Sequence, residues 1–226
     1  MGIFCVRKPR SNPAAHGLRV GLPDMVSHVR GARGFSLVEM LMVVAIMGVL
    51  AAVAIPMSGN AIKYAKISGD ARDLSNDLAA TKMRAAAKFT QARLYVDLSG
   101  GSYYMQTCNT PATTPCPAWT TQGGSTSLSN TVTFSYGIVS AAPSNTQTTI
   151  GQAAPCKDAS NNDVANSACV IFNSRGIPVD SRGSPTGSYA LYVTDHSLVY
   201  GITIAATGFI RTWQTNYTST PTWTLQ

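Results

Sequence analysis

The sequence has few of the residues on which catalytic and metal sites usually depend. It contains three histidines, and two of them, His16 and His28, precede a long apolar segment that begins at Phe35. No nucleophile motif or glycine-rich phosphate loop accompanies the third, His196. Asp195 and His196 are adjacent, and adjacent side chains in a strand point to opposite faces, so a hairpin turn explains them better than an acid–base pair. These absences argue against an enzyme, and the sequence indicates no cofactor.

Acidic residues are also scarce, and most of the net charge of +7 comes from the N-terminal end. Six of the seventeen Lys and Arg residues lie before Phe35, against one acid, Asp24. Residues 35–226 therefore carry eleven basic and nine acidic side chains, a net charge of +2. The basic balance of the whole chain is consequently weak ground for nucleic-acid binding.

The segment from Phe35 to Ile55 contains 21 residues with a single ionisable side chain, Glu39. At 1.5 Å per residue, a helix of this length spans roughly 32 Å, enough to cross the hydrocarbon core of a bilayer. The basic residues before it indicate a cytoplasmic N-terminus, because positive charge is retained on that side of the membrane. The sequence predicts one membrane-spanning helix and export of the chain that follows it.

Helical periodicity continues beyond Pro56. An apolar stripe with spacings of four, three, four and four residues is formed by Leu74, Leu78, Thr81, Ala85 and Phe89. We expect water to meet the opposite face, which carries Asp70, Arg72, Asp73, Asp77, Lys82, Arg84 and Lys88. Pro56, Gly59 and Gly69 should bend the helix, since Pro lacks a backbone donor and Gly is flexible. The prediction is one long, kinked helix from about Ser36 to Gln91.

Beyond this helix, β-branched and aromatic residues alternate with polar ones, which predicts strands. The predicted strands are residues 92–98, 102–107, 131–136, 168–173, 189–195, 197–205 and 209–213. Two stretches, Cys108 to Asn130 and Val139 to Ser167, are rich in Thr, Ser, Asn, Gly and Pro and are expected to be irregular. A long helix followed by strands is typical of an α+β fold.

Five cysteines are present, Cys5 before the membrane segment and four after it. Export places the last four in an oxidising compartment, where they should pair. Of the three connectivities we favour Cys108 with Cys116 and Cys156 with Cys169, each closing a short polar loop and contributing about 3 kcal/mol. A zinc site is the alternative, but the spacings lack close cysteine pairs and no histidine lies nearby.

The most specific signal is the run Arg33-Gly34-Phe35-Ser36-Leu37-Val38-Glu39. It resembles the processing site of type IV prepilins, shared by pilins and type II secretion pseudopilins. The resemblance implies that a prepilin peptidase cuts after Gly34 and methylates the new N-terminal residue, Phe35. Glycine leaves the backbone unhindered for a protease. Unlike the cut of a secretory signal, this one retains the whole apolar helix as an anchor.

Glu39 is anomalous because a carboxylate inside an apolar helix costs about 2.5 to 3.5 kcal/mol at mid-bilayer. The resemblance implies an assembly role, in which Glu39 pairs with the freed amine of a neighbouring pilin or pseudopilin as the helices stack. The alternative is a glutamate that reaches the cytoplasmic headgroups. We expect Glu39→Ala to be processed and exported but absent from filaments.

The 34-residue leader is long for this kind of signal, and Met25 offers a later start. A start there would also delete Cys5 and leave an even number of cysteines. The domains expected are a leader (1–34), a membrane and assembly helix (35–56), its amphipathic continuation (57–91) and a periplasmic or extracellular β head (92–226).

The C-terminal half resembles the GspH/FimT group of minor pilins and pseudopilins through Val170–Gly176 and Gly208–Arg211. This resemblance implies two antiparallel sheets packed against the helix, and a minor pilin that helps to initiate or cap a type IV pilus. We expect the protein to span the inner membrane once, with its head in the periplasm, before it enters the filament. A type II secretion pseudopilin is the alternative. Gly176 should supply a turn with positive φ.

Some members of the group bind DNA through a Gly-Arg-x-Arg segment. In the matching segment here, Phe209 replaces the first Arg. Arg211, Trp213 and Tyr217 remain candidate contacts to DNA, as a phosphate ligand and stacking surfaces, although an ordinary edge strand explains them equally well.

Overall fold

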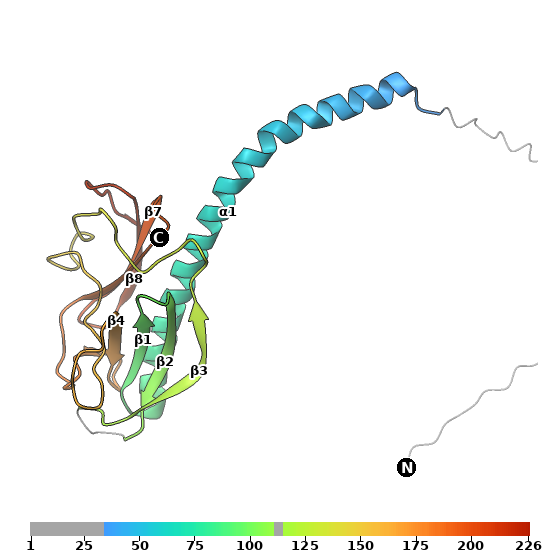
Figure 1. Cartoon of the computed structure of the whole chain (residues 1–226). Helices are drawn as coiled ribbons and strands as arrows, with labels where there is room; N and C mark the ends of the chain where they lie inside the picture. The colour runs from blue at the N-terminus through green and yellow to red at the C-terminus, as the bar shows by residue number, and fades with distance from the viewer. Residues whose placement is uncertain (1–33, 111–114) are drawn as a thin grey trace, which may run out of the picture. The chain divides into compact units, whose positions relative to one another are not determined.

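The computed structural model describes residues 34–110 and 115–226, which form one helix followed by nine strands (Figure 1). The helix is α1 (Leu37–Lys88). The strands form a five-stranded and a four-stranded sheet, and every strand pair is antiparallel. The expected α+β fold with two antiparallel sheets is therefore confirmed. The predictions for the leader, Cys5 and a start at Met25 fall outside the described residues.

Helix α1 is 52 residues long, and its bounds lie within three residues of the predicted ones. It continues as α-helix through Pro56 and Gly59, so the expected bend stays a prediction. The contacts within the chain divide it into two units after Gly48, inside this helix. The second unit, Val49–Gln226, contains the rest of the helix and all the strands.

A stripe along the C-terminal half of α1 forms one wall of the main core. The stripe consists of six fully buried residues, Ile67, Ala71, Leu74, Leu78, Thr81 and Ala85. Their spacings of four, three, four, three and four residues keep them on one face of an α-helix. Four of the five predicted stripe residues are correct. Phe89 is wrong, because the helix ends at Lys88 and the Phe89 side chain is 81% exposed.

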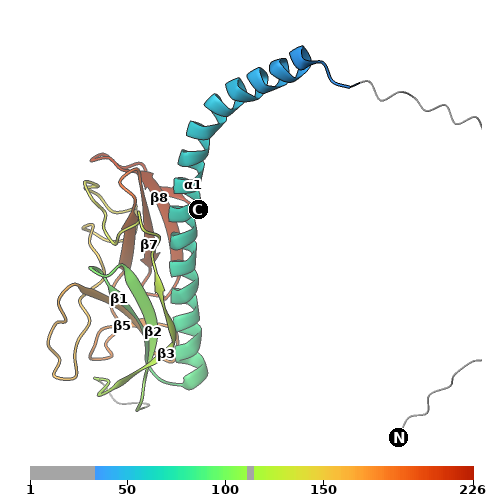
Figure 2. The ribbon, with the colours of Figure 1, turned by 45° about the vertical axis from the view of Figure 1, so that its right-hand side comes forward.

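Both sheets pack against this stripe, as Figure 2 shows for the C-terminal half of α1. The first sheet has the order β3-β2-β1-β4-β5, with β1 (Ala92–Asp97), β2 (Ser102–Cys108), β3 (Trp119–Ser127), β4 (Ser167–Phe172) and β5 (Pro178–Val179). The second has the order β6-β7-β8-β9, with β6 (Tyr189–Thr194), β7 (Leu198–Ile204), β8 (Ile210–Asn216) and β9 (Thr224–Leu225). Leu94, Val170, Leu191 and Ile202 bring one strand each to the common core.

Six of the seven predicted strands are present, and one is wrong. In the range 131–136 only Thr133 pairs, through an isolated bridge to Thr194. Val132 and Phe134 are buried, so the apolar alternation reflects a loop that crosses the core rather than a strand. Strand β3 lies in a stretch predicted to be irregular, and the two-residue strands β5 and β9 were not expected.

The end of α1 contains a strained residue that can be relieved. Phe89 has φ 51°, a left-handed conformation that costs a residue with a side chain about 1 kcal/mol or more. Glycine adopts this conformation freely at the end of a helix. Since the exposed ring buries little, we expect Phe89→Gly to raise the free energy of unfolding by about 1 kcal/mol. Urea unfolding in detergent measures this, and a lower midpoint than that of Phe89→Ala would contradict it.

Candidate processing and assembly site

The bond expected to be cut lies just outside the helix. Gly34, Phe35 and Ser36 precede the first helical residue, Leu37, and all three are exposed. A Cβ placed on Gly34 would meet no atom within 4 Å, and the residue does not have positive φ. The chain itself therefore tolerates a side chain at position 34. A requirement for glycine there would have to come from the enzyme that binds this segment.

The start of α1 contains a feature that the sequence analysis did not identify. The carbonyl of Ser36 accepts the first intrahelical hydrogen bond, from Met40 N at 3.1 Å, which makes Ser36 the N-cap. Glu39 then occupies the third helical position, and Ser-x-x-Glu is the capping-box pattern. An acid in the first turn is also favoured by the helix dipole. The position of Glu39 is therefore one that favours the start of the helix, and this effect must be separated from any role in assembly.

The turns that follow are apolar on every face. Residues Leu37–Ala54 have a mean hydropathy of 2.5, and none of the segment is buried. A helix that is apolar all round is stable only when lipid or other helices cover it. This part of α1 is long and apolar enough to span a membrane.

Two segments of the GspH/FimT resemblance meet at a lysine of α1. Lys82 Nζ donates a hydrogen bond of 2.8 Å to the carbonyl oxygen of Gly208. Gly176 and Gly208 have φ of 73° and 78°, so Gly176 does provide the turn expected of it. A Cβ on Gly208 would lie 2.1 Å from the carbonyl oxygen of Gly176. The two glycines therefore allow two loops and the helix to approach closely.

The contact at Gly208 leads to a stability prediction. Gly208→Ala would force backbone atoms apart and place alanine at positive φ, so we expect the free energy of unfolding to fall by roughly 2 to 4 kcal/mol. Gly187→Ala is the matched control, because an added Cβ there meets no atom within 4 Å. The control should shift stability by about 0.5 kcal/mol or less. Equal unfolding midpoints for the two variants would contradict the described contact.

The sequence suggested that the polar face of α1 meets water, but part of this face contacts the head. Asp70 accepts hydrogen bonds from Ser129 N and Oγ at 2.9 and 3.1 Å. Arg84 donates to Gln122 Oε1 at 3.1 Å, and Lys82 bonds Gly208 as described. Three charged side chains therefore tie the helix to the head instead of facing solvent alone.

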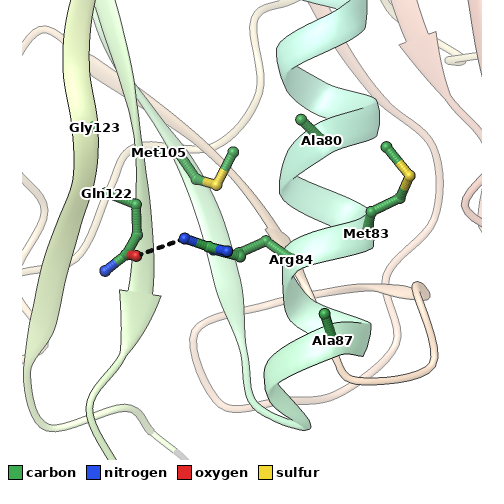
Figure 3. A pocket seen from close by; sticks show the side chains of 7 residues that line it. All are labelled: Ala80, Met83, Arg84, Ala87, Met105, Gln122 and Gly123. Carbon is green, nitrogen blue, oxygen red and sulfur yellow. Dashed lines mark hydrogen bonds between the residues drawn. The ribbon is translucent and has the colours of Figure 1, made fainter. Parts of the chain in front are cut away.

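A groove lies between this face of α1 and strands β2 and β3 (Figure 3). It has a volume of about 410 Å³ and is lined by Ala80, Met83, Arg84, Ala87, Met105, Gln122 and Gly123. The hydrogen bond from Arg84 to Gln122 crosses it, and the Met83 side chain is 65% exposed. Four of its lining residues, Ala80, Met83, Ala87 and Met105, are apolar, and methionine adapts its shape to different contacts.

The candidate DNA contacts differ in how accessible they are. Arg211 is exposed, with its guanidinium carbon 5.1 Å from the centre of the Phe209 ring. Trp213 is half-buried, and its indole Nε1 donates to Thr203 Oγ1 at 2.9 Å. The Tyr217 ring packs edge to face against the His196 ring. Of the three candidates, Arg211 is exposed, whereas Trp213 and Tyr217 are half-buried.

Asp195 and His196 form the turn between β6 and β7. Asp195 Oδ1 accepts hydrogen bonds from the backbone N–H groups of Ser197 and Leu198, both at 2.9 Å. Burial acts to raise the pKa of Asp195, but the hydrogen bonds from Ser197 and Leu198 outweigh it, so this pKa lies below its ordinary value. His196 has φ 64°. The pair shapes a hairpin, as the sequence indicated.

The four cysteines that follow the apolar segment form two disulfides. Cys108 is bonded to Cys116, and Cys156 to Cys169, which is the pairing favoured from the sequence. None of these sulfurs is a free thiolate, so this set of cysteines does not provide the ligands of a zinc site. The bonds close two loops beside the five-stranded sheet.

Comparison with known proteins bears on the N-terminal segment. The prokaryotic N-terminal methylation motif matches residues 29–55, which include the Gly34–Phe35 bond, Glu39 and the apolar turns. No curated protein and no solved structure matches the chain significantly. The motif implies processing by a prepilin peptidase and assembly with other pilins, and it suggests a structural protein rather than an enzyme. The match, together with the apolar helix, supports a type IV pilin-like protein, a pilin or a pseudopilin, anchored in a membrane.

Proposed function

We propose that this chain is a minor pilin of the GspH/FimT group, which enters a type IV pilus and helps to initiate or cap the filament. The observation that carries the proposal is a methylation motif on the first turns of a 52-residue helix, whose later turns hold a folded head. In this account, cleavage after Gly34 leaves residues 35–56 as the membrane and assembly helix. Residues 57–91 continue it, and residues 92–226 form the head.

The exposed apolar turns give the physical reason for assembly. Before assembly the segment Leu37–Ala54 would lie in the inner membrane as a single span, with the head in the periplasm. In a filament, packed helices of other pilins would replace the lipid. Lipid tails and packed apolar helices solvate such a segment equally well, so polar contacts give the association its specificity. Glu39 is the one ionisable group in this segment that can supply them.

The head would assemble through a surface that its own core leaves free. The stripe from Ile67 to Ala85 is buried in the core of the head. Ala80, Met83 and Ala87 instead line the open groove. A neighbouring subunit that covered this groove would remove exposed apolar area from water. The partners we propose are a prepilin peptidase and other minor pilins.

Gly176 and Gly208 both lie against Lys82, and this contact supports the group assignment because it explains why each of the two motif segments contains a glycine. A minor pseudopilin of a type II secretion system has the same expected architecture and is the alternative. Deletion of the gene distinguishes them. Loss of surface pili with normal protein secretion supports the minor pilin, whereas retained pili with lost secretion supports the pseudopilin.

DNA binding is a second alternative, favoured by the exposed Arg211 over the Phe209 ring. The two side chains border a cleft of about 300 Å³ whose other lining residues include Asn145, Thr146 and Thr207. A phosphate contact of this kind weakens with added salt. A salt-dependent mobility shift of duplex DNA that disappears in Arg211→Ala would support this function. A shift that persists in the variant would exclude Arg211 from it.

A further inference from the structure

A second, smaller core lies on the face of the five-stranded sheet opposite α1. Side chains alternate along β1, so Leu94 and Val96 face the helix while Arg93 and Tyr95 face the other way. On that outer side the apolar cluster consists of Cys156, Cys169, Ile171 and Val179, with Tyr95, Trp119 and Val164 packed against it. Trp119, the first residue of β3, and Cys156, which is bonded to Cys169, both belong to this cluster.

A positive charge is buried beside this cluster. Arg93 is 7% exposed, and its guanidinium carbon lies 4.2 Å from the centre of the Trp119 ring and 5.7 Å from that of Tyr95. Its Nε donates to Gln106 Oε1 at 2.8 Å, and Nη1 donates to the carbonyl oxygen of Lys157 at 3.1 Å. Burial lowers the pKa of Arg93 to about 10, which leaves the group charged at neutral pH.

Within the described residues, no carboxylate pairs with this charge. The ion pair found in that part of the chain joins Lys157 to Asp163, at 2.7 Å. Arg93 therefore has two neutral acceptors and two aromatic faces, but no counter-charge. A guanidinium has five N–H donors, so hydrogens on both terminal nitrogens remain without a described acceptor. The buried side-chain atoms without a partner in the described residues do not include an Arg93 nitrogen, so these hydrogens are open to solvent and to an anion.

Arg93 lines a pocket of about 160 Å³ that has two walls, one from residues 115–119 and one from the loop closed by Cys156 and Cys169. The first wall consists of Pro115 and Cys116, at the end of the loop closed by Cys108 and Cys116, and of Pro117 and Trp119, which follow that loop. The second supplies Lys157, Asp158, Ala159 and Asn161, and Ile171 and Ser181 complete the lining. A disulfide joins Cys116 to Cys108 at the end of β2, and another joins Cys156 to Cys169 in β4, so both walls are tied to the five-stranded sheet.

One acid lines the pocket, but its hydrogen bonds lie within its own turn. Asp158 Oδ1 accepts hydrogen bonds from Ser160 N and Asn162 N at 2.9 and 2.8 Å. The bond from Asn162 leads the effects that hold the pKa of Asp158 below its ordinary value. Asp158 is thus a charge that repels anions at the wall, while Arg93 attracts them.

We propose that this pocket binds a carboxylate group, with the buried Arg93 guanidinium as its charge partner. The free N–H groups on both terminal nitrogens match the two oxygens of a planar carboxylate, which guanidinium binds in a bidentate manner. The small volume admits a carboxylate with few additional atoms. The group can belong to a small free acid or to an acidic side chain of another protein, and both sources present the same chemistry.

The test is a titration of the full-length protein in detergent micelles, with the indole N–H signal of Trp119 observed by NMR. Trp119→Phe identifies the signal. Sodium acetate should shift it in a saturable manner, and sodium chloride at equal ionic strength should not. Arg93→Gln should weaken acetate binding at least tenfold, while Arg175→Gln, which removes an exposed cation outside the pocket lining, should leave it unchanged.

A second variant keeps the proposal testable if Arg93→Gln does not fold. Asp158→Asn removes the repelling charge but retains an oxygen for the turn, so acetate binding should tighten by a few fold. Acetylglutamate amide distinguishes the sources, because tighter binding than acetate indicates an acidic side chain and weaker binding a small free acid. No saturable shift with either probe, unchanged affinity in Asp158→Asn, or tighter binding of phosphate than of acetate would overturn the assignment.

Discussion

Glu39→Ala should leave the protein cleaved and in the membrane but remove it from filaments. Loss of one partner of a buried charge pair costs about 2 to 5 kcal/mol, which is more than tenfold in the association constant. The measurement is the fraction of mature protein in sheared filaments relative to the membrane fraction. We expect that fraction to fall at least tenfold.

The position of Glu39 in the first turn of α1 provides the matched control. Glu39→Gln retains a side chain that can complete the capping box with Ser36, but it removes the charge. If the charge acts in assembly, Gln should fail as Ala does. Normal incorporation of Gln with loss of Ala would show that Glu39 acts through the helix start alone, and normal incorporation of both variants would exclude a role of Glu39 in assembly.

Gly34→Leu should leave the precursor uncut. The structure accommodates a Cβ at position 34 without contact, so the substitution should not disturb the folded head. The effect should arise in the active site of the peptidase, which must bind the backbone closely. An immunoblot should show a heavier band that remains in the membrane fraction, since the apolar helix is unchanged.

Gly48→Ala is the control for this prediction. Gly48 lies in the apolar part of α1, where an added Cβ also meets no atom within 4 Å. That variant should be processed normally because it lies well beyond the cut. Complete processing of Gly34→Leu would place the cut elsewhere or assign it to another protease.

The helix could be predicted because its signals are local and repeated. The stripe through Leu74, Leu78, Thr81 and Ala85 follows the period of an α-helix, and burial confirms it. Phe89 continued the spacing but falls one residue past the last helical one. The left-handed conformation that ends α1 has no signal at Phe89, where glycine would have indicated it.

Strands with few buried side chains were harder to predict from the sequence. Strand β3 has the sequence WTTQGGSTS and lies at the edge of its sheet, so no apolar alternation marks it. Its hydrogen bonds to β2 come from the backbone and require no particular side chains. Conversely, Val132 and Phe134 alternate because both are buried, although the chain there does not join a sheet.

In the candidate site, too, features of consecutive residues could be predicted, whereas contacts between distant segments could not. The run from Gly34 to Glu39 could be identified from the sequence because a peptidase and a helix start both recognise consecutive residues. Lys82 was expected to face water, since nothing near it in sequence indicates that Gly208 lies within reach. Arg93 carried one weak signal, a cation between the core residues Ala92 and Leu94, but its aromatic and loop partners depend on the fold.

The mature protein should begin at Phe35. Mass spectrometry of the N-terminal peptide, on protein purified from the membranes of its native host, tests it most directly. We expect a peptide that begins at Phe35 and carries one methyl group on its α-amine. A mature N-terminus at any other residue, or an intact segment across Gly34 and Phe35, would contradict the account.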